Sequence, residues 1–207
     1  MTPNEQDALI IIDVQNDFCQ QGALAVPDGE QVVPVINQLA KKFQTVVLTQ
    51  DWHPANHASF ASSHNAEPFT TTTLHYGEQT LWPDHCVQGS KGAEFHSELR
   101  YNNASVIIRK GMHQNIDSYS AFFENDRTTP TGLIGYLHTM KIKRVFCAGL
   151  AFDFCVRYTA EDAATQMFET IVIENACRAI DMDGSVTDTV QSFLKNEIAL
   201  LQSSEIN

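Results

Sequence analysis

Short apolar runs alternate with segments of helical periodicity along most of the chain. The runs are rich in β-branched residues, which is typical of strands buried on both faces. They cover residues 8–12, 45–48, 105–108, 144–148 and 170–173. Helical periodicity covers residues 31–43, 131–140, 155–168 and 185–201. Because strands that alternate with helices form right-handed crossovers, the pattern predicts an α/β fold with a doubly wound, mostly parallel sheet and helices on both faces.

Residues 51–101 interrupt this alternation. The segment is rich in Pro, His, Ser, Thr and Gly and shows little periodicity. A segment of this length without regular structure is uncommon in a compact domain unless it is functional. The length of 207 residues is within the range of one α/β domain. We therefore expect a single domain over residues 1–207, with a functional, loop-rich insertion at about residues 51–101.

Composition and charge narrow the classes of partner. The chain is 43% hydrophobic and 18% charged, which is ordinary for a packed globular protein. Its formal net charge of -12 repels phosphate groups, which argues against nucleic acids and anionic membranes and leaves a small neutral substrate. The apolar run 8–12 is far shorter than the ~20 residues of a membrane span. A homo-oligomer is compatible with this composition.

The cysteines predict a reducing environment. There are 5 of them, an odd number at irregular spacing, so a disulfide framework is not expected. We infer a cytoplasmic location, in which thiols stay free. Four of the five have the character of small core residues: Cys19, Cys86, Cys147 and Cys177.

Four reactive side chains lie at or just past the ends of predicted strands. They are Asp13, Asp51, Lys110 and Cys155. Taken singly, Asp13 suits a turn and Lys110 a solvated loop, but the carboxyl ends of parallel strands meet at one edge, where ligands bind. Cys155 also lies in the first turn of a predicted helix, which lowers a thiol pKa and presents free backbone N–H groups. This environment favours a nucleophile with an oxyanion site.

A second group of residues has the chemistry of metal ligands. Asp51 and His53 point to the same side of an extended backbone, and His85 would complete a site of two histidines and one carboxylate. Each histidine alone is more often a packing residue. His57 is either a further ligand or a residue that orients the ligands. Zinc, iron and manganese all suit such a site, and the ligand set does not separate them.

Five sequence strings resemble the nicotinamidase branch of the isochorismatase-like cysteine hydrolases. They occur in the family's order and cover nearly the whole chain: LIIIDVQNDFC, TQDWHPANHASF, WPDHCVQGS, KGMHQNIDSYSAFF and GLAFDFCVRYTAEDA. The resemblance implies an isochorismatase-like, Rossmann-like three-layer fold with a six-stranded sheet.

The resemblance also implies roles for catalytic residues. Asp13, Lys110 and Cys155 match the family's catalytic triad. The backbone N–H groups of Ala151 and Cys155 match its oxyanion site, and the peptide bond between Leu150 and Ala151 is expected to be cis. In the implied mechanism Asp13 takes the thiol proton, Lys110 favours the thiolate, and Cys155 attacks the amide carbon to form a thioester.

Further roles concern the metal and the substrate ring. Asp51, His53 and His85 match the family's ligands for one divalent metal ion, for which zinc is our expectation and iron or manganese the alternatives. Phe18 and Trp82 match aromatic walls around the ring, although both residue types are also common in cores. The metal is expected to bind the pyridine nitrogen, directly or through water, and so to orient the ring.

The implied reaction is hydrolysis of nicotinamide to nicotinate and ammonia in NAD salvage, with pyrazinamide as a related substrate. One alternative is a metal-independent relative that acts on a ureido or N-carbamoyl compound or on isochorismate, and the intact metal set argues against it. A second alternative is a member of the family that binds a ligand but is catalytically inactive. The complete triad argues against it, because a protein that only binds a ligand does not need a nucleophile. Phe152 departs from the small or polar residue that the family often has, and its place beside the oxyanion residue Ala151 leaves its effect on the shape of the pocket open.

Overall fold

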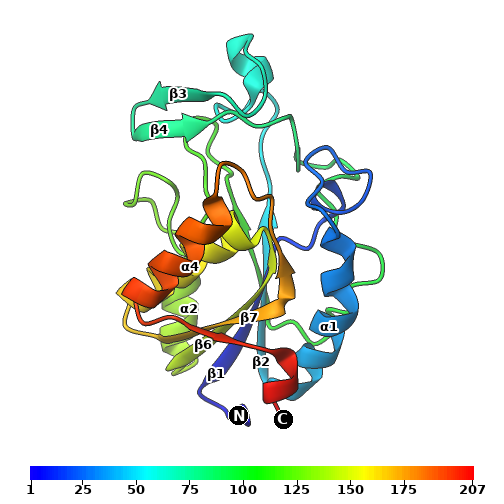
Figure 1. Cartoon of the computed structure of the whole chain (residues 1–207), viewed down its shortest axis with the longest axis vertical. Helices are drawn as coiled ribbons and strands as arrows, with labels where there is room; N and C mark the ends of the chain where they lie inside the picture. The colour runs from blue at the N-terminus through cyan, green and yellow to red at the C-terminus, as the bar shows by residue number, and fades with distance from the viewer.

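A single parallel sheet of six strands forms the centre of the molecule (Figure 1). The computed structural model describes residues 1–207. In spatial order the strands are β5 (Val106–Lys110), β2 (Thr45–Asp51), β1 (Asp7–Ile12), β6 (Arg144–Leu150), β7 (Glu169–Arg178) and β8 (Ala199–Leu201). All neighbouring strands pair in parallel. The predicted doubly wound α/β architecture is confirmed, and the sheet is wholly rather than mostly parallel.

Helices cover both faces of the sheet. They are α1 (Val32–Leu39), α2 (Leu133–Thr139), α3 (Arg157–Thr165) and α4 (Ser185–Lys195). Alternate residues of β1 feed two separate cores: Leu9 and Ile11 join the core that includes α1, whereas Ala8, Ile10 and Ile12 join the core that includes α2 and α3. Because a strand's side chains alternate between its faces, the apolar run of β1 stabilises both layers at once.

Two of the predicted helices are corrected at their ends. The helix predicted over 185–201 ends at Lys195; Glu197 then adopts a left-handed conformation with φ 56°, and β8 pairs with β7. An apolar run of three residues is too short for its period to distinguish a strand from a last helical turn. The helix predicted over 155–168 is a π-helical turn, Phe152–Val156, followed by α3.

The segment between β2 and β5 stands apart from the sheet. It contains the antiparallel hairpin of β3 (Thr71–Leu74) and β4 (Gly77–Thr80), at the top of Figure 1. Short 3-10 helices occur at Asn16–Phe18, Gly29–Gln31, Ala40–Lys42, Ala61–His64 and Ser203–Glu205. The two chain ends meet at the opposite end of the molecule, where the Asn207 N–H donates to the Met1 carbonyl at 2.8 Å.

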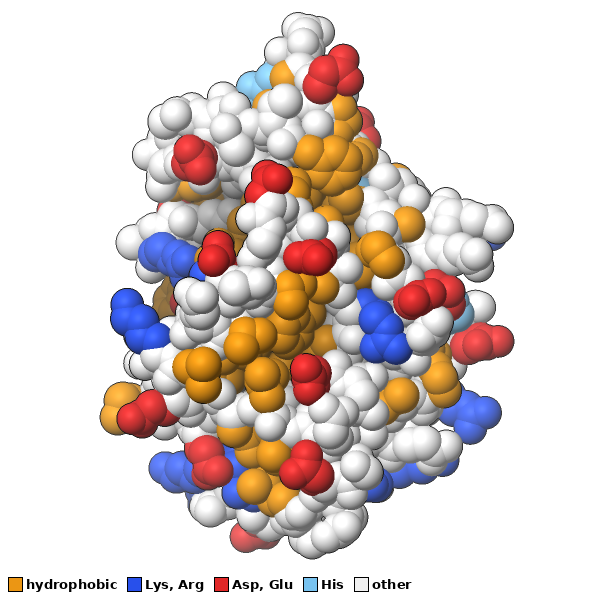
Figure 2. All heavy atoms as spheres, viewed as in Figure 1, with side chains coloured by type: hydrophobic (Ala, Val, Ile, Leu, Met, Phe, Trp, Pro, Cys, Tyr) orange, Lys and Arg blue, Asp and Glu red, His pale blue; other side chains and the backbone are white.

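Most apolar side chains pack in the two hydrophobic cores, but some lie on the surface. Figure 2 shows hydrophobic side chains in a band along the middle of one face, with acidic side chains around it. Met167 and Leu194 are the most exposed large apolar residues, at 90% and 76%. None of the helices combines the length and the apolar character needed to cross a bilayer.

Candidate active site

The candidate site lies where the strand order reverses, between β1 and β6. Asp13 follows β1, and Cys155 lies in the π-helical turn that follows β6. Asp51 and Lys110 are the last residues of β2 and β5 and are paired in the parallel register. Parallel strands therefore bring all four side chains to one edge of the sheet, as the sequence predicts.

Lys110 is the centre of the reactive group. Its side chain is buried, and Nζ donates to Asp51 Oδ1 and to the Ser118 carbonyl at 2.8 Å, and it forms an ion pair with Asp13 Oδ2 at 2.8 Å. The Cys155 Sγ lies 3.5 Å from Nζ. A buried ammonium ion is tolerated only when it is paired, so these contacts hold a positive charge beside the thiol.

Asp13 is held from two sides within reach of the thiol. The Thr49 hydroxyl donates to Oδ1 at 2.6 Å, and the Asp13 N–H donates to that same hydroxyl at 3.2 Å. Oxygen atoms of Asp13 and Asp51 and the Cys155 Sγ lie within 4.8 Å of one another. The fixed carboxylate is therefore placed to exchange a proton with the sulfur.

The expected lowering of the thiol pKa is not found. Burial raises the pKa of Cys155 well above its ordinary value, and it outweighs the attraction of Lys110. Burial likewise raises the pKa of Asp13, although Lys110 opposes it. The sequence could not predict this direction because the depth of burial is a property of the tertiary structure. Burial thus favours the neutral form of this thiol.

The π-helical turn around Cys155 is anchored by backbone and side-chain contacts. The Phe154 and Val156 N–H groups donate to the Ala151 carbonyl at 3.1 and 3.0 Å. The peptide bond between Leu150 and Ala151 is cis, as the family resemblance implies. The buried Asp153 carboxylate accepts hydrogen bonds from the following loop, namely from the N–H groups of Ile180 and Asp181 and the hydroxyl of Ser185.

Phe152 lies in the core and is not among the residues that line the cavity at Cys155. Its ring packs edge-to-face against Phe193 of α4, with centroids 5.6 Å apart. The side chain that departs from the family pattern therefore stabilises the junction between the π-helical turn and α4, and it does not shape the cavity wall.

Asp51, His53 and His85 form a group that fits a metal ion. Their ligand atoms lie within 4.8 Å of one another. The Nδ1 atoms of His53 and His85 face the carbonyls of Gly111 and Pro83 at 3.0 and 2.8 Å, which assigns the proton to Nδ1. Both Nε2 atoms then face Asp51 Oδ2, at 3.6 and 3.8 Å. Backbone carbonyls that orient histidines in this way are typical of metal sites.

The electrostatics of this group also suit a cation. The buried Nε2 of His53 has no hydrogen-bond partner. Burial, together with the nearby His53, lowers the pKa of His85 to about 4, so that imidazole is neutral. Burial alone would raise the pKa of Asp51, but Lys110 and His53 hold it well below its ordinary value. A neutral histidine and an ionised carboxylate are the ligand forms that bind metals.

His57 lies next to the metal group but uses both of its ring nitrogens elsewhere. Its ring centroid is 4.4 Å from that of His53. Nδ1 accepts from the Ser59 hydroxyl at 2.7 Å, and Nε2 faces the carbonyls of His113 and Ile116 at 2.9 and 3.1 Å. This arrangement leaves no lone pair for a metal, so the geometry favours the orienting role for His57 over that of a ligand.

An aromatic cavity of about 330 Å³, including its open mouth, adjoins both groups. It is lined by Phe18, Leu24, Asp51, Trp82, His85, Asp117, Tyr119, Ala151, Phe154, Cys155 and Ile180. Phe18 packs edge-on against His85, with ring centroids 5.5 Å apart, and Trp82 packs against Phe154 at 5.0 Å. The predicted wall residues Phe18 and Trp82 therefore do line the cavity that contains Cys155.

Sequence reasoning missed several lining residues, chiefly Leu24, Asp117, Tyr119, Phe154 and Ile180. Two of the quoted strings contained a signal. Phe154 directly precedes Cys155, and an aromatic residue beside a nucleophile is a candidate for contact with the substrate. Asp117 and Tyr119 follow Lys110 within one loop. Leu24 and Ile180 gave no comparable signal, because isolated aliphatic residues suit any core.

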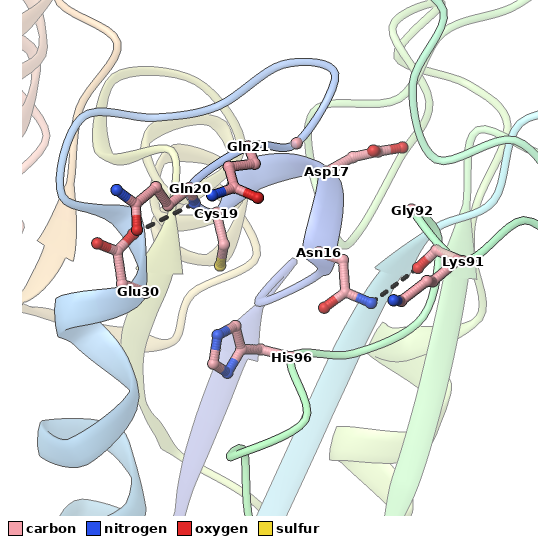
Figure 3. A pocket seen from close by; sticks show the side chains of 10 residues that line it. Asn16, Asp17, Cys19, Gln20, Gln21, Glu30, Lys91, Gly92 and His96 are labelled. Atoms are coloured by element: carbon pink, nitrogen blue, oxygen red, sulfur yellow. Dashed lines mark hydrogen bonds between the residues drawn. The ribbon is translucent and has the colours of Figure 1, made fainter.

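Asp17 connects the segment of the cavity residue Phe18 to the segment of His85, and it lies at the edge of a separate polar hollow (Figure 3). Its Oδ2 accepts from the Cys86 N–H at 2.7 Å, and its Oδ1 accepts from the Ala23 N–H at 3.2 Å. Cys86 follows the metal-group residue His85, and Asp17 precedes the wall residue Phe18. One carboxylate thus fixes the relative position of two parts of the site.

Gly92 allows this carboxylate to approach, so we expect the Gly92→Ala variant to be less stable. A Cβ atom at Gly92 would lie 2.0 Å from Asp17 Oδ2, and the carboxylate would have to leave its N–H donors. Loss of a hydrogen bond to a charged group costs about 1.5–3 kcal/mol, and urea unfolding would measure this decrease in the free energy of unfolding.

The control is Gly135→Ala, in which the new Cβ in α2 meets no atom within 4 Å. Its free energy of unfolding should rise by about 0.5–1 kcal/mol. Equal stability of Gly92→Ala and the wild type would contradict the prediction.

Comparisons with known proteins agree with this geometry. The family model of the isochorismatase domain matches residues 7–202. A nicotinamidase of Acinetobacter baylyi is 52% identical over 200 residues, which are 96% of this chain and 94% of the relative. The structure of the nicotinamidase/pyrazinamidase of Acinetobacter baumanii is 51% identical, covers 99% of both chains and superposes with a TM-score of 0.97.

Two further solved structures contain bound groups. PnC1 from L. infantum in complex with nicotinate is 38% identical and has a TM-score of 0.88, with 100% of this chain and 98% of that chain covered. The pyrazinamidase of Pyrococcus horikoshii in complex with zinc is 33% identical and has a TM-score of 0.78, with 95% and 99% covered.

Proposed function

The chain belongs to the isochorismatase family, and from this membership and its site we propose that it is an amidase that hydrolyses nicotinamide to nicotinate and ammonia. The observation that carries the proposal is one aromatic cavity whose lining includes Cys155 of the Cys155–Asp13–Lys110 group together with Asp51 and His85 of the Asp51–His53–His85 group. Relatives at high identity are nicotinamidases, and one structure holds nicotinate. Pyrazinamide, whose aromatic ring has the same shape as that of nicotinamide, is the second proposed substrate.

The first half of the reaction uses the buried pair beside the sulfur. Cys155 Sγ attacks the carboxamide carbon while its proton passes to the Asp13 carboxylate, 2.8 Å from the Lys110 ammonium. Lys110 keeps its charge and stabilises the negative charge that forms. We propose that the N–H groups of Ala151 and Cys155 receive the oxyanion. The C–N bond then breaks, and Asp13 returns the proton to the departing nitrogen, which leaves as ammonia.

The second half releases the acid from the enzyme. The thioester on Cys155 is attacked by water, whose proton passes to Asp13. The C–S bond breaks, and the sulfur takes the proton back from Asp13. The nicotinic acid that forms loses its carboxyl proton to solvent and leaves as nicotinate. One buried carboxylate thus acts as base and then as acid in both halves, which is consistent with its fixed position between Thr49 and Lys110.

Asp51, His53 and His85 would hold one divalent ion, with zinc proposed because a related pyrazinamidase binds it. Such an ion supplies positive charge next to Asp51 and a coordination position that orients the pyridine nitrogen. Asp51, whose pKa Lys110 and His53 hold well below its ordinary value, offers an ionised carboxylate to a cation. We propose that His57 keeps the His53 ring in place and is not itself a ligand.

The remaining proposals concern context. We propose that residues 1–207 act as one hydrolase domain and that residues 51–101, which supply all three metal-group residues, are its metal-binding insertion. A role in NAD salvage follows from the substrate. The cytoplasmic location and a homo-oligomer stay predictions, and measurement of the mass in solution would test the oligomer.

Ammonia release from nicotinamide is the direct test of the proposed function. We expect the zinc-loaded protein to release ammonia and nicotinate in equal amounts, and pyrazinamide to react as well. The same protein should release no ammonia from an N-carbamoyl amine, because the aromatic cavity offers rings a large contact surface and a ureido group little. Ammonia from the N-carbamoyl amine alone would refute the proposal and establish the ureido amidase in its place.

A further inference from the structure

The β3–β4 hairpin buries only one side chain from its two strands, that of Gln79. The other residues of β3 and β4 are exposed or half-buried, whereas Gln79 is 1% exposed. An isolated two-stranded hairpin is at best marginally stable in water, so its contacts with the rest of the domain decide where it lies. A buried glutamine needs partners for all its polar atoms, and these partners identify the surface that the hairpin covers.

The side-chain amide of Gln79 has one permitted orientation. Nε2 has three acceptors within hydrogen-bond distance, and its two hydrogens are shared among them: the Thr80 carbonyl at 2.7 Å, Asp117 Oδ2 at 2.8 Å and the Tyr119 hydroxyl at 3.0 Å. Oε1 accepts from the Tyr76 hydroxyl at 2.9 Å and from the Asn125 amide at 3.2 Å. If nitrogen and oxygen were exchanged, Oε1 would face the Asp117 carboxylate without a hydrogen between them. The network therefore fixes Asp117 and Tyr119 relative to the hairpin.

These two residues belong to the wall of the cavity. Asp117 and Tyr119 both line it, and the Tyr119 hydroxyl also accepts from the indole N–H of Trp82 at 3.1 Å. The residue between them, Ser118, accepts from Lys110 Nζ through its carbonyl. Residues 117–119 thus contact the ring wall and the catalytic group together, and Gln79 holds both ends of this segment.

We infer that Gln79 is a positioning residue: through Asp117 and Tyr119 it holds the Trp82 wall of the cavity and so determines how tightly the substrate ring binds. Without the amide, the buried Asp117 Oδ2 loses a donor and the Tyr119 hydroxyl loses one of its two. Lys110 keeps its contacts with Asp13 and Asp51, so chemistry at Cys155 should change less than binding. The identity of the ring rests on the proposed function, but the position of Trp82 does not.

The test replaces Gln79 by methionine, which has a similar length but no amide. All proteins carry Trp52→Phe, because the chain has 2 tryptophans and Trp82 must be the one that emits. Trp82 emission of Gln79→Met should move to longer wavelength as the indole becomes more exposed to water. The KM for nicotinamide should rise about tenfold, as expected for one lost hydrogen bond, and kcat should change by less than about threefold.

Two further variants keep the result interpretable. Glu78→Gln changes the exposed neighbour on β4 and should alter neither emission nor KM. Tyr119→Phe removes only the shared oxygen and should shift emission and KM in the same direction as Gln79→Met; it decides the matter if Gln79→Met does not fold. Unchanged emission and KM in the folded variant, or a fall in kcat alone, would overturn the inference. If the wild type fails to hydrolyse nicotinamide, the proposed function falls and Trp82 emission alone decides the role of Gln79.

Discussion

The Cys155→Ala variant is expected to lose at least about 10⁴-fold in kcat for nicotinamide, because it lacks the sulfur that forms the covalent intermediate in the proposed mechanism. The sulfur lies 3.5 Å from the Lys110 ammonium and next to the Asp13 carboxylate, and alanine leaves both without a nucleophile to activate. Nicotinate should still bind to the variant with little change, since the aromatic walls remain. Stopped assays for ammonia, with nicotinate binding measured by calorimetry, separate the two effects.

Matched controls come from the same sheet. Cys147 in β6 and Cys177 in β7 are buried free thiols whose pKa is raised by burial, and they lie outside the cavity lining. Their alanine variants should keep most of the activity. Asp13→Asn keeps the size of the side chain but cannot take a proton, so kcat should fall by about 10²–10⁴-fold. Ammonia release by Cys155→Ala at the wild-type rate would end the covalent mechanism.

The convergence of Asp13, Asp51, Lys110 and Cys155 was predictable because it depends on topology. Once apolar runs identify parallel strands, the residues at their carboxyl ends must share an edge, and the structure brings these four together. The thiol pKa was not predictable by the same means. The sequence places Cys155 near a helix N-terminus, but whether that effect or burial dominates depends on the residues packed around the sulfur.

The contacts of the hairpin illustrate a second limit. Residues 71–80 are mostly polar, and nothing in their local pattern distinguishes Gln79 from its exposed neighbours. Its partners Asp117 and Tyr119 lie about forty positions away, so only the tertiary structure identifies it. The strand β8 was missed for a related reason, because pairing with β7, and not its own short sequence, makes it a strand.

The metal group should govern selectivity for the ring. Benzamide presents the same carboxamide on a ring without nitrogen, so it should be a poorer substrate than nicotinamide by about 100-fold, the loss expected when a reacting carbon drifts by about 1 Å from its nucleophile. His53→Ala removes a proposed ligand whose buried Nε2 has no hydrogen-bond partner. This variant should contain little zinc by mass spectrometry, and its kcat/KM for nicotinamide should fall to the level of benzamide.

The comparison of two amides distinguishes orientation of the ring from general damage. If His53→Ala only disturbed folding, both substrates would lose activity in proportion and their ratio would persist. If the group orients the ring through its nitrogen, only nicotinamide loses an advantage, because benzamide never had it. The exposed His138 of α2 supplies the control, since His138→Ala should keep both the zinc content and the ratio. Equal hydrolysis of the two amides by the zinc-loaded wild type would refute the orienting role, and full nicotinamide turnover by zinc-free His53→Ala would show that the reaction needs no metal.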